Sequence, residues 1–170
     1  LDYIAIAAVL IIGVPHGGLD GAVARRVGWT PNFVGWLTFH LAYIAIAAIV
    51  TAIWWWFPTV SLGLFLVISA LHFGVSDIRH IMQMGKNHWL PAMAHGGLVA
   101  IAIPVFHTEA VTPIFSILVG DAGAQSLITI IEYAMKAYVA IVITYLIYSF
   151  RVSKWRVPAA NLVVLLLIAY

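Results

Sequence analysis

The chain has 170 residues, of which 64% are hydrophobic and only 8% are charged, and its mean hydropathy is +1.07. Soluble domains are about a quarter charged and half apolar, so this composition excludes a water-soluble globular protein. The eight basic and six acidic residues are spread along the chain and form no basic face, which excludes nucleic acid binding. The absence of cysteine excludes disulfides, thiolate catalysis and cysteine-based metal sites.

A membrane-spanning helix needs about 20 mainly apolar residues, and apolar runs of this kind recur along the chain. We therefore predict an all-α fold, a polytopic transmembrane helix bundle with about six spans. In chain order, the expected spans cover residues 1–15, 34–57, 60–77, 89–106, 127–150 and 158 onward. Between the fourth and fifth spans, Pro113, Gly120, Asp121 and Gly123 interrupt the apolar pattern and predict a loop with a short interfacial helix.

Residues 1–170 are expected to form a single integral membrane domain that is cut at both ends. Residue 1 is a leucine inside an apolar run, and no basic stretch precedes it as in a signal peptide. The last apolar run, from Pro158 to Tyr170, is shorter than a span. We therefore expect the natural protein to be longer.

Charge predicts the orientation of the bundle, because basic loops favour the cytoplasmic side. The loops on one side of the expected bundle carry Lys and Arg, whereas those on the other side carry only Glu109 and Asp121. All seven tryptophans fall at expected span ends, where the boundary with water favours them. The basic residues that mark the cytoplasmic side are Arg25, Arg26, Arg79, Lys86, Arg151, Lys154 and Arg156.

Four histidines fall within the expected spans at a similar depth, in the cytoplasmic half. They are His16, His40, His72 and His95. A single histidine in a span is explained by a hydrogen bond to a carbonyl, but several inward-facing histidines are how a bundle builds a metal site. The histidines in loops or at boundaries, which are expected to be solvated, are His80, His88 and His107.

Two of the four histidines have glycine after them and an aspartate nearby. Glycine permits close backbone approach, and an aspartate four or five residues on can bond the free N–H of a ligating imidazole. His40 and His95 have no such acid and are expected to have structural roles. The two histidine boxes read Pro15-His16-Gly17-Gly18-Leu19-Asp20 and His72-Phe73-Gly74-Val75-Ser76-Asp77.

The aspartates of the two boxes have a second interpretation. Asp20 and Asp77 lie near expected helix ends, so each could cap a helix or pair with the nearby Arg25 or Arg79. The residue pattern leaves both interpretations open.

These two boxes, with Ala70-Leu71 before the second, resemble the signatures of the Brp/Blh family of β-carotene 15,15′-dioxygenases. The stretch from Gly96-Gly97-Leu98 to Ile103-Pro104, followed by Phe106-His107, is similar to that family's next helix and loop. The similarity covers most of residues 1–120 and is more diffuse up to residue 170.

The resemblance implies a multispanning enzyme of the cell membrane that splits the central double bond of β-carotene with O2. The products would be two molecules of retinal, formed at a non-haem Fe(2+) held by histidines. Carried over residue by residue, only His16 and His72 are implied as iron ligands. The spacing of the boxes, and not the resemblance, suggests Asp20 and Asp77 as their hydrogen-bond partners. The family's other ligands form a His-x-x-x-His pair in a later helix, which we expect beyond residue 170 because no histidine follows His107.

Two other functions suit intramembrane histidines. A haem-binding electron carrier holds a porphyrin between two histidines on different spans, but it needs no glycine or aspartate beside them. A transporter or proton relay needs acids at several depths, whereas Glu132 is the only acid deep in an expected span. The sequence therefore favours the dioxygenase, with β-carotene, O2 and membrane lipid as its partners.

Overall fold

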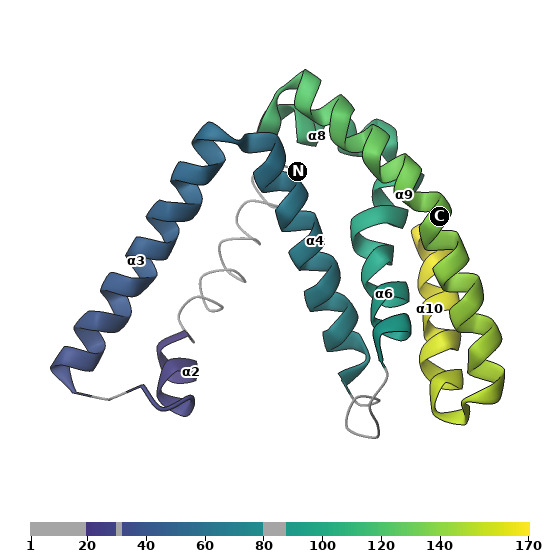
Figure 1. Ribbon diagram of the computed structural model, residues 1–170, viewed down its shortest axis with the longest axis horizontal. Helices are drawn as coiled ribbons and strands as arrows, with labels where there is room; N and C mark the ends of the chain where they lie inside the picture. The colour runs from purple at the N-terminus through teal and green to yellow at the C-terminus, as the bar shows by residue number, and fades with distance from the viewer. Residues whose placement is uncertain (1–19, 30–31, 80–87) are drawn as a thin grey trace. The chain divides into compact units, whose positions relative to one another are not determined.

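The computed structural model describes residues 20–29, 32–79 and 88–170. These residues form helices and turns with no strand among them, which confirms the all-α prediction (Figure 1). The elements are α2 (Asp20–Arg26), α3 (Phe33–Trp56), α4 (Pro58–Asp77), α6 (Trp89–Gly97), the π-helical turn η1 (Leu98–Ala102), α7 (Ile103–Phe106), α8 (Thr108–Val119), α9 (Asp121–Arg151), the 3-10 turn η2 (Ser153–Trp155) and α10 (Arg156–Ala169).

Four helices in the described part are long and apolar enough to cross a membrane, and each corresponds to an expected span. The expected span 1–15 lies outside the described residues. The last expected span forms α10, whose 14 residues are fewer than a span needs. The four helices cover Phe33–Trp56, Pro58–Asp77, Trp89–Phe106 and Asp121–Arg151.

The segment between the fourth and fifth expected spans is more helical than its composition predicts. It forms the 12-residue helix α8, and α9 begins at Asp121 instead of near residue 127. The two helices meet at Gly120, whose φ of +76° is a conformation that glycine adopts without strain. A tight turn at Gly120 therefore replaces the expected loop.

The contacts divide the chain into two compact units, Leu1–Ala52 and Ile53–Tyr170, and each is described by itself. In the first unit, the indole N–H of Trp29 donates to the Gly35 carbonyl over 2.7 Å. The Asn32 side-chain oxygen accepts from the Gly35 N–H, also over 2.7 Å. These two bonds hold the connection between α2 and the start of α3.

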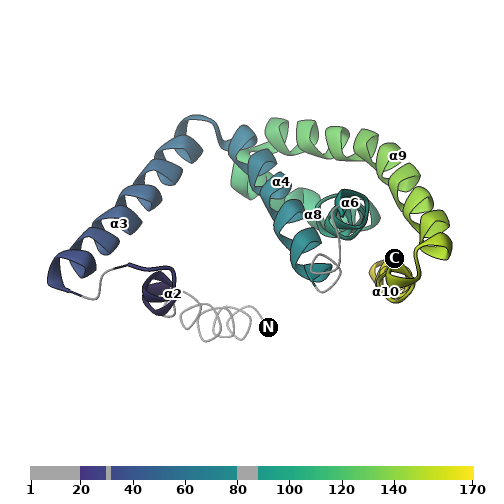
Figure 2. The same ribbon diagram turned by 60° about the horizontal axis from the view of Figure 1, so that its bottom comes forward.

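In the second unit, α6 lies between α4 and α10, as Figures 1 and 2 both show. One buried core joins α6, α9 and α10, and its largest members are Tyr138, Tyr145, Trp155, Ile78 and Leu162. A second core joins α4, α8 and α9 and consists of Leu62, Phe115, Ala124, Leu127, Ile128 and Ile131.

Small residues bring the backbones of α4 and α6 into direct contact. A Cβ atom on Gly74 would strike the carbonyl oxygen of Ala92, and one on Gly96 would strike the carbonyl oxygen of Ala70. Within lipid, burial of apolar surface does not drive helices together, so close packing of small residues is what holds such a pair. Two glycines therefore set the distance between α4 and α6.

The span Trp89–Phe106 contains one wide turn. The N–H of Ile103 donates to the carbonyl of Leu98, five residues earlier, as in a π-helix. Pro104 follows directly, has no N–H, and its ring would clash with the Ala100 carbonyl in a regular α-helix. The proline explains why the helix widens at η1.

Candidate functional site

The structure describes three of the four side chains that the sequence predicts at the site. His72 and Asp77 lie in the last two turns of α4, and Asp20 is the first residue of α2. His16 lies outside the described residues, so its role as a metal ligand stays a prediction. The part of the site that can be described is therefore the end of α4 and the helices packed against it.

In the second unit, the side chain of His72 is exposed at the surface of α4. Its ring meets that of Phe73 edge-on, with 5.5 Å between the ring centroids and 79° between the planes. Within the described ranges, no hydrogen bond occupies either ring nitrogen of His72. A neutral imidazole in this state can use a ring nitrogen as a metal ligand.

An apolar groove of about 360 Å³ runs along a different side of α4. Gly63 and Ala70 line it, together with residues of α6, η1 and α9. At 3.6 residues per turn, His72 lies about 180° around the helix axis from Gly63 and about 160° from Ala70. Leu71, the residue directly before His72, also lines this groove, whereas His72 itself does not.

Asp77 binds the imidazole of His95 on α6, 18 residues further along the chain. His95 is only 4% exposed, whereas the Asp77 side chain is 50% exposed. Because an ionised carboxylate only accepts, Nδ1 of His95 carries the hydrogen and donates it. Asp77 lies about 140° around α4 from His72, and the predicted bond between these two residues is not among the described contacts.

The other ring nitrogen of His95 faces α9. The Tyr145 hydroxyl lies 3.5 Å from Nε2, and the two rings meet at 65° with 5.7 Å between their centroids. In a neutral imidazole with the hydrogen on Nδ1, Nε2 would be the acceptor for the Tyr145 O–H. Nearby, the Tyr138 hydroxyl donates to the carbonyl of Ala94 over 2.8 Å. Polar contacts therefore tie α6 to both α4 and α9.

The sequence pattern indicates no acid near His95, but the structure places the Asp77 carboxylate against its ring. Sequence spacing pointed Asp77 toward His72, because only those two residues are close along the chain. The sequence feature that could have paired His95 with Asp77 was their depth, because both belong to the predicted cytoplasmic half of the bundle. Depth alone does not show which helix faces turn toward each other.

Two other histidines bond to backbone carbonyls. Nδ1 of His40 donates to the carbonyl of Trp36 over 2.8 Å, and Nε2 of His107 donates to that of Ala169 over 2.8 Å. The first bond lies within α3, and a structural role for His40 stays a prediction. The second joins His107 to the end of α10, while His107 is exposed, as the sequence predicts.

Asp20 occupies the first turn of α2. A carboxylate there interacts favourably with the helix dipole, as one of the two interpretations of this residue expects. Its carboxylate also lies near the hydroxyl of Tyr43 on α3. The role of Asp20 as a partner of His16 stays a prediction.

The described part of the chain does not contain a complete metal site. Within these residues, no three His, Asp or Glu side chains converge as they would around a metal ion. His72 fits one ligand position, because no residue in the described ranges bonds its ring nitrogens. Beside the Asp77–His95 pair lies a cavity of about 440 Å³, which Phe73, Ser76, Leu98, Val99 and Leu165 also line.

The chain is similar to known proteins over nearly all of its length. Residues 7–170 match the sequence model of the family described as beta-carotene 15,15′-dioxygenase. A protein of that name from uncultured marine bacterium 66A03 is 36% identical over 119 residues, which are 69% of this chain and 42% of that protein. The chain thus spans less than half of this relative's length, and no solved structure matches it. The chain belongs to the beta-carotene 15,15′-dioxygenase family.

Proposed function

We propose that the full-length protein cleaves the central double bond of β-carotene with O2 and releases two molecules of retinal. The carbon–carbon double bond breaks, and each oxygen atom of O2 ends as the aldehyde oxygen of one retinal. The family match over residues 7–170 carries this proposal, and the relative's name supports it.

We propose Fe(2+) as the cofactor, with His72 and His16 among its ligands. His72 supports this role because none of the described residues bonds its ring nitrogens, whereas His40, His95 and His107 each have a ring nitrogen engaged in a hydrogen bond. When bound, the iron would supply the activation of O2.

The residues of this chain would position and shield the reaction. The contact of Asp77 with His95, and of His95 with Tyr145, fixes the last turns of α4 against α6 and α9. His72 lies on these turns, so the same contacts fix its position along the axis of α4 and the direction in which it leaves the helix. The exposed apolar side chains of Leu71 and Phe73 on either side of His72 favour a hydrocarbon substrate.

The test is retinal formation in cells that make β-carotene. The full-length protein should bleach them and produce retinal, measured by chromatography, whereas His72→Ala should lower retinal by at least about 100-fold, since even outer partners of ligands cost roughly 10–100-fold. His40→Ala is the matched control, because it also removes an intramembrane histidine but one that bonds its own helix.

Each part of the proposal has its own contrary outcome. Absence of retinal from folded, iron-loaded protein would contradict the dioxygenase. Unchanged iron content in purified His72→Ala would contradict the ligand assignment alone. A Soret band in the purified protein would favour a haem carrier instead.

A further inference from the structure

The junction between α9 and α10 concentrates positive charge. Arg151 ends α9, Lys154 lies in η2, and Arg156 begins α10. No Asp or Glu occurs in the sequence between Glu132 and Tyr170. The two acids of α9, Asp121 and Glu132, lie several turns before Arg151, and α10 contains none.

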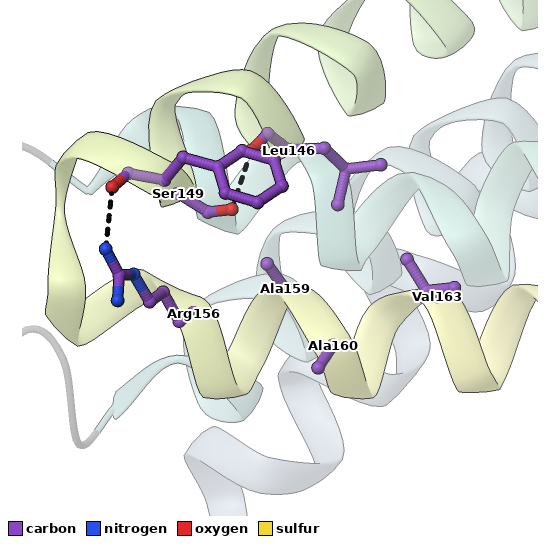
Figure 3. A pocket seen from close by; sticks show the side chains of 7 residues that line it. Leu146, Ser149, Arg156, Ala159, Ala160 and Val163 are labelled. Carbon is purple, nitrogen blue, oxygen red and sulfur yellow. Dashed lines mark hydrogen bonds between the residues drawn. The ribbon is translucent and has the colours of Figure 1, made fainter.

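A cavity of about 550 Å³ lies at this junction, between the last turns of α9 and the first turns of α10 (Figure 3). One end of it is polar, with the guanidinium of Arg156 and the hydroxyl of Ser149. The rest is apolar, and its lining consists of Leu146, Phe150, Ala159, Ala160 and Val163.

The polar end of the cavity is held in place by hydrogen bonds. Nη2 of Arg156 donates to the Phe150 carbonyl over 3.0 Å, and Ser149 Oγ donates to the Leu146 carbonyl over 2.6 Å (Figure 3). A guanidinium has five N–H donors, so this bond orients Arg156 and leaves donors for an anion. Within the described residues, no carboxylate forms a salt bridge with Arg156.

The cavity also lies at the end of an apolar span. Helix α9 is long and apolar enough to span a membrane, and its apolar run ends at Phe150, directly before Arg151. Basic side chains at the end of a span reach the headgroup layer, while apolar residues before them contact acyl chains. The cavity has the same order, with Arg156 at one end and Val163 on the apolar wall.

We propose that this cavity binds one anionic phospholipid. The phosphate binds the guanidinium of Arg156 through charge-assisted hydrogen bonds, and the upper part of an acyl chain lies against Ala159, Ala160 and Val163. The small side chains of the two alanines leave the space for the chain. This site does not depend on the proposed dioxygenase activity, and it lies apart from His72.

The test measures lipid binding to the purified full-length protein in detergent. Dioleoyl phosphatidylglycerol should bind and raise the unfolding temperature by roughly 5 °C at concentrations far above Kd, whereas dioleoyl phosphatidylcholine and inorganic phosphate should not. Arg156→Gln should weaken phosphatidylglycerol binding by roughly tenfold or more, because a hydrogen bond between charged groups is lost. Ala160→Leu should also weaken it by filling the cavity.

Arg151→Gln is the matched control, since it removes the same charge from a residue that does not line the cavity. Its affinity should stay within about twofold of the unchanged protein, because the Arg151 charge is exposed, screened by salt and not bonded to the phosphate. Equal losses in Arg151→Gln and Arg156→Gln would show general attraction to the surface and overturn the site. Equal binding of the two lipids, competition by inorganic phosphate, or an unchanged affinity in Ala160→Leu would also overturn it.

Discussion

His95 is held on both sides of its ring by groups from other helices. Nδ1 donates to Asp77 on α4, and Nε2 faces the Tyr145 hydroxyl on α9. Burying an imidazole costs little folding free energy when both ring nitrogens are hydrogen-bonded. Burying one without hydrogen-bond partners in a water-free interior costs much more. We therefore interpret these three residues as a polar clamp, which we define as Asp77, His95 and Tyr145.

Replacing the acid of the polar clamp tests this interpretation. Asp77→Leu should lower the free energy of unfolding by about 1–3 kcal/mol, because the buried Nδ1–H of His95 loses its acceptor. Asp77→Asn is the matched control, since its amide oxygen can still accept this hydrogen bond and should retain most of the stability. Thermal unfolding in detergent measures both variants, and equal stability of the two would contradict the clamp.

At the scale of the helices, α4 and α6 approach more closely than any larger residue would allow. The carbonyl of Ala92 faces Gly74, and that of Ala70 faces Gly96. The same pair of helices carries Asp77 and His95. The close approach therefore determines whether the polar clamp can form.

Substituting glycine at this contact should separate the two helices. Gly96→Ala should lower stability by about 1–3 kcal/mol, since its Cβ meets backbone that cannot move aside easily. Gly63→Ala, also within a helix, would place its Cβ 3.5 Å from a Leu127 side-chain carbon, which is an ordinary contact. Its stability should be unchanged or slightly higher because alanine favours helix. Equal unfolding temperatures for the two variants would contradict the role of this contact.

At the scale of the whole molecule, four described helices can cross a membrane. Most charged residues lie at or beyond the helix ends, whereas Glu132 and Lys136 lie within α9. Lys and Arg gather at the ends where α4 stops and where α9 joins α10, whereas Glu109 lies in the first turn of α8. We propose on this basis that the His72 end of α4 faces the cytoplasm of the cell.

The proposed orientation predicts which positions a membrane-impermeant maleimide reaches on intact cells. These 170 residues contain no cysteine, so single cysteines can be placed once any others in the full-length protein are replaced. Glu109→Cys should be labelled from outside, and Ser153→Cys only after the cells are opened. The reverse pattern would invert the topology without affecting the family assignment.

The sequence by itself determined the all-α class and the positions of four spans, with boundaries that mostly agree to within two residues. These features are local, because a chain in lipid must satisfy its backbone hydrogen bonds internally and apolar length identifies each span. The family resemblance also followed from short motifs. The early start of α9 was missed, because Gly120 makes a turn where composition suggested a loop.

The tertiary structure decided how the helices are rotated against each other, and with it the partners of the candidate site. Residues 72 and 77 are neighbours in sequence but lie on different sides of α4, so Asp77 meets His95 instead. The backbone contact at Gly74 and Gly96, like the cavity beside Arg156, also joins helices whose relative rotation no local pattern encodes. Side chains from distant segments meet only after the helices have packed.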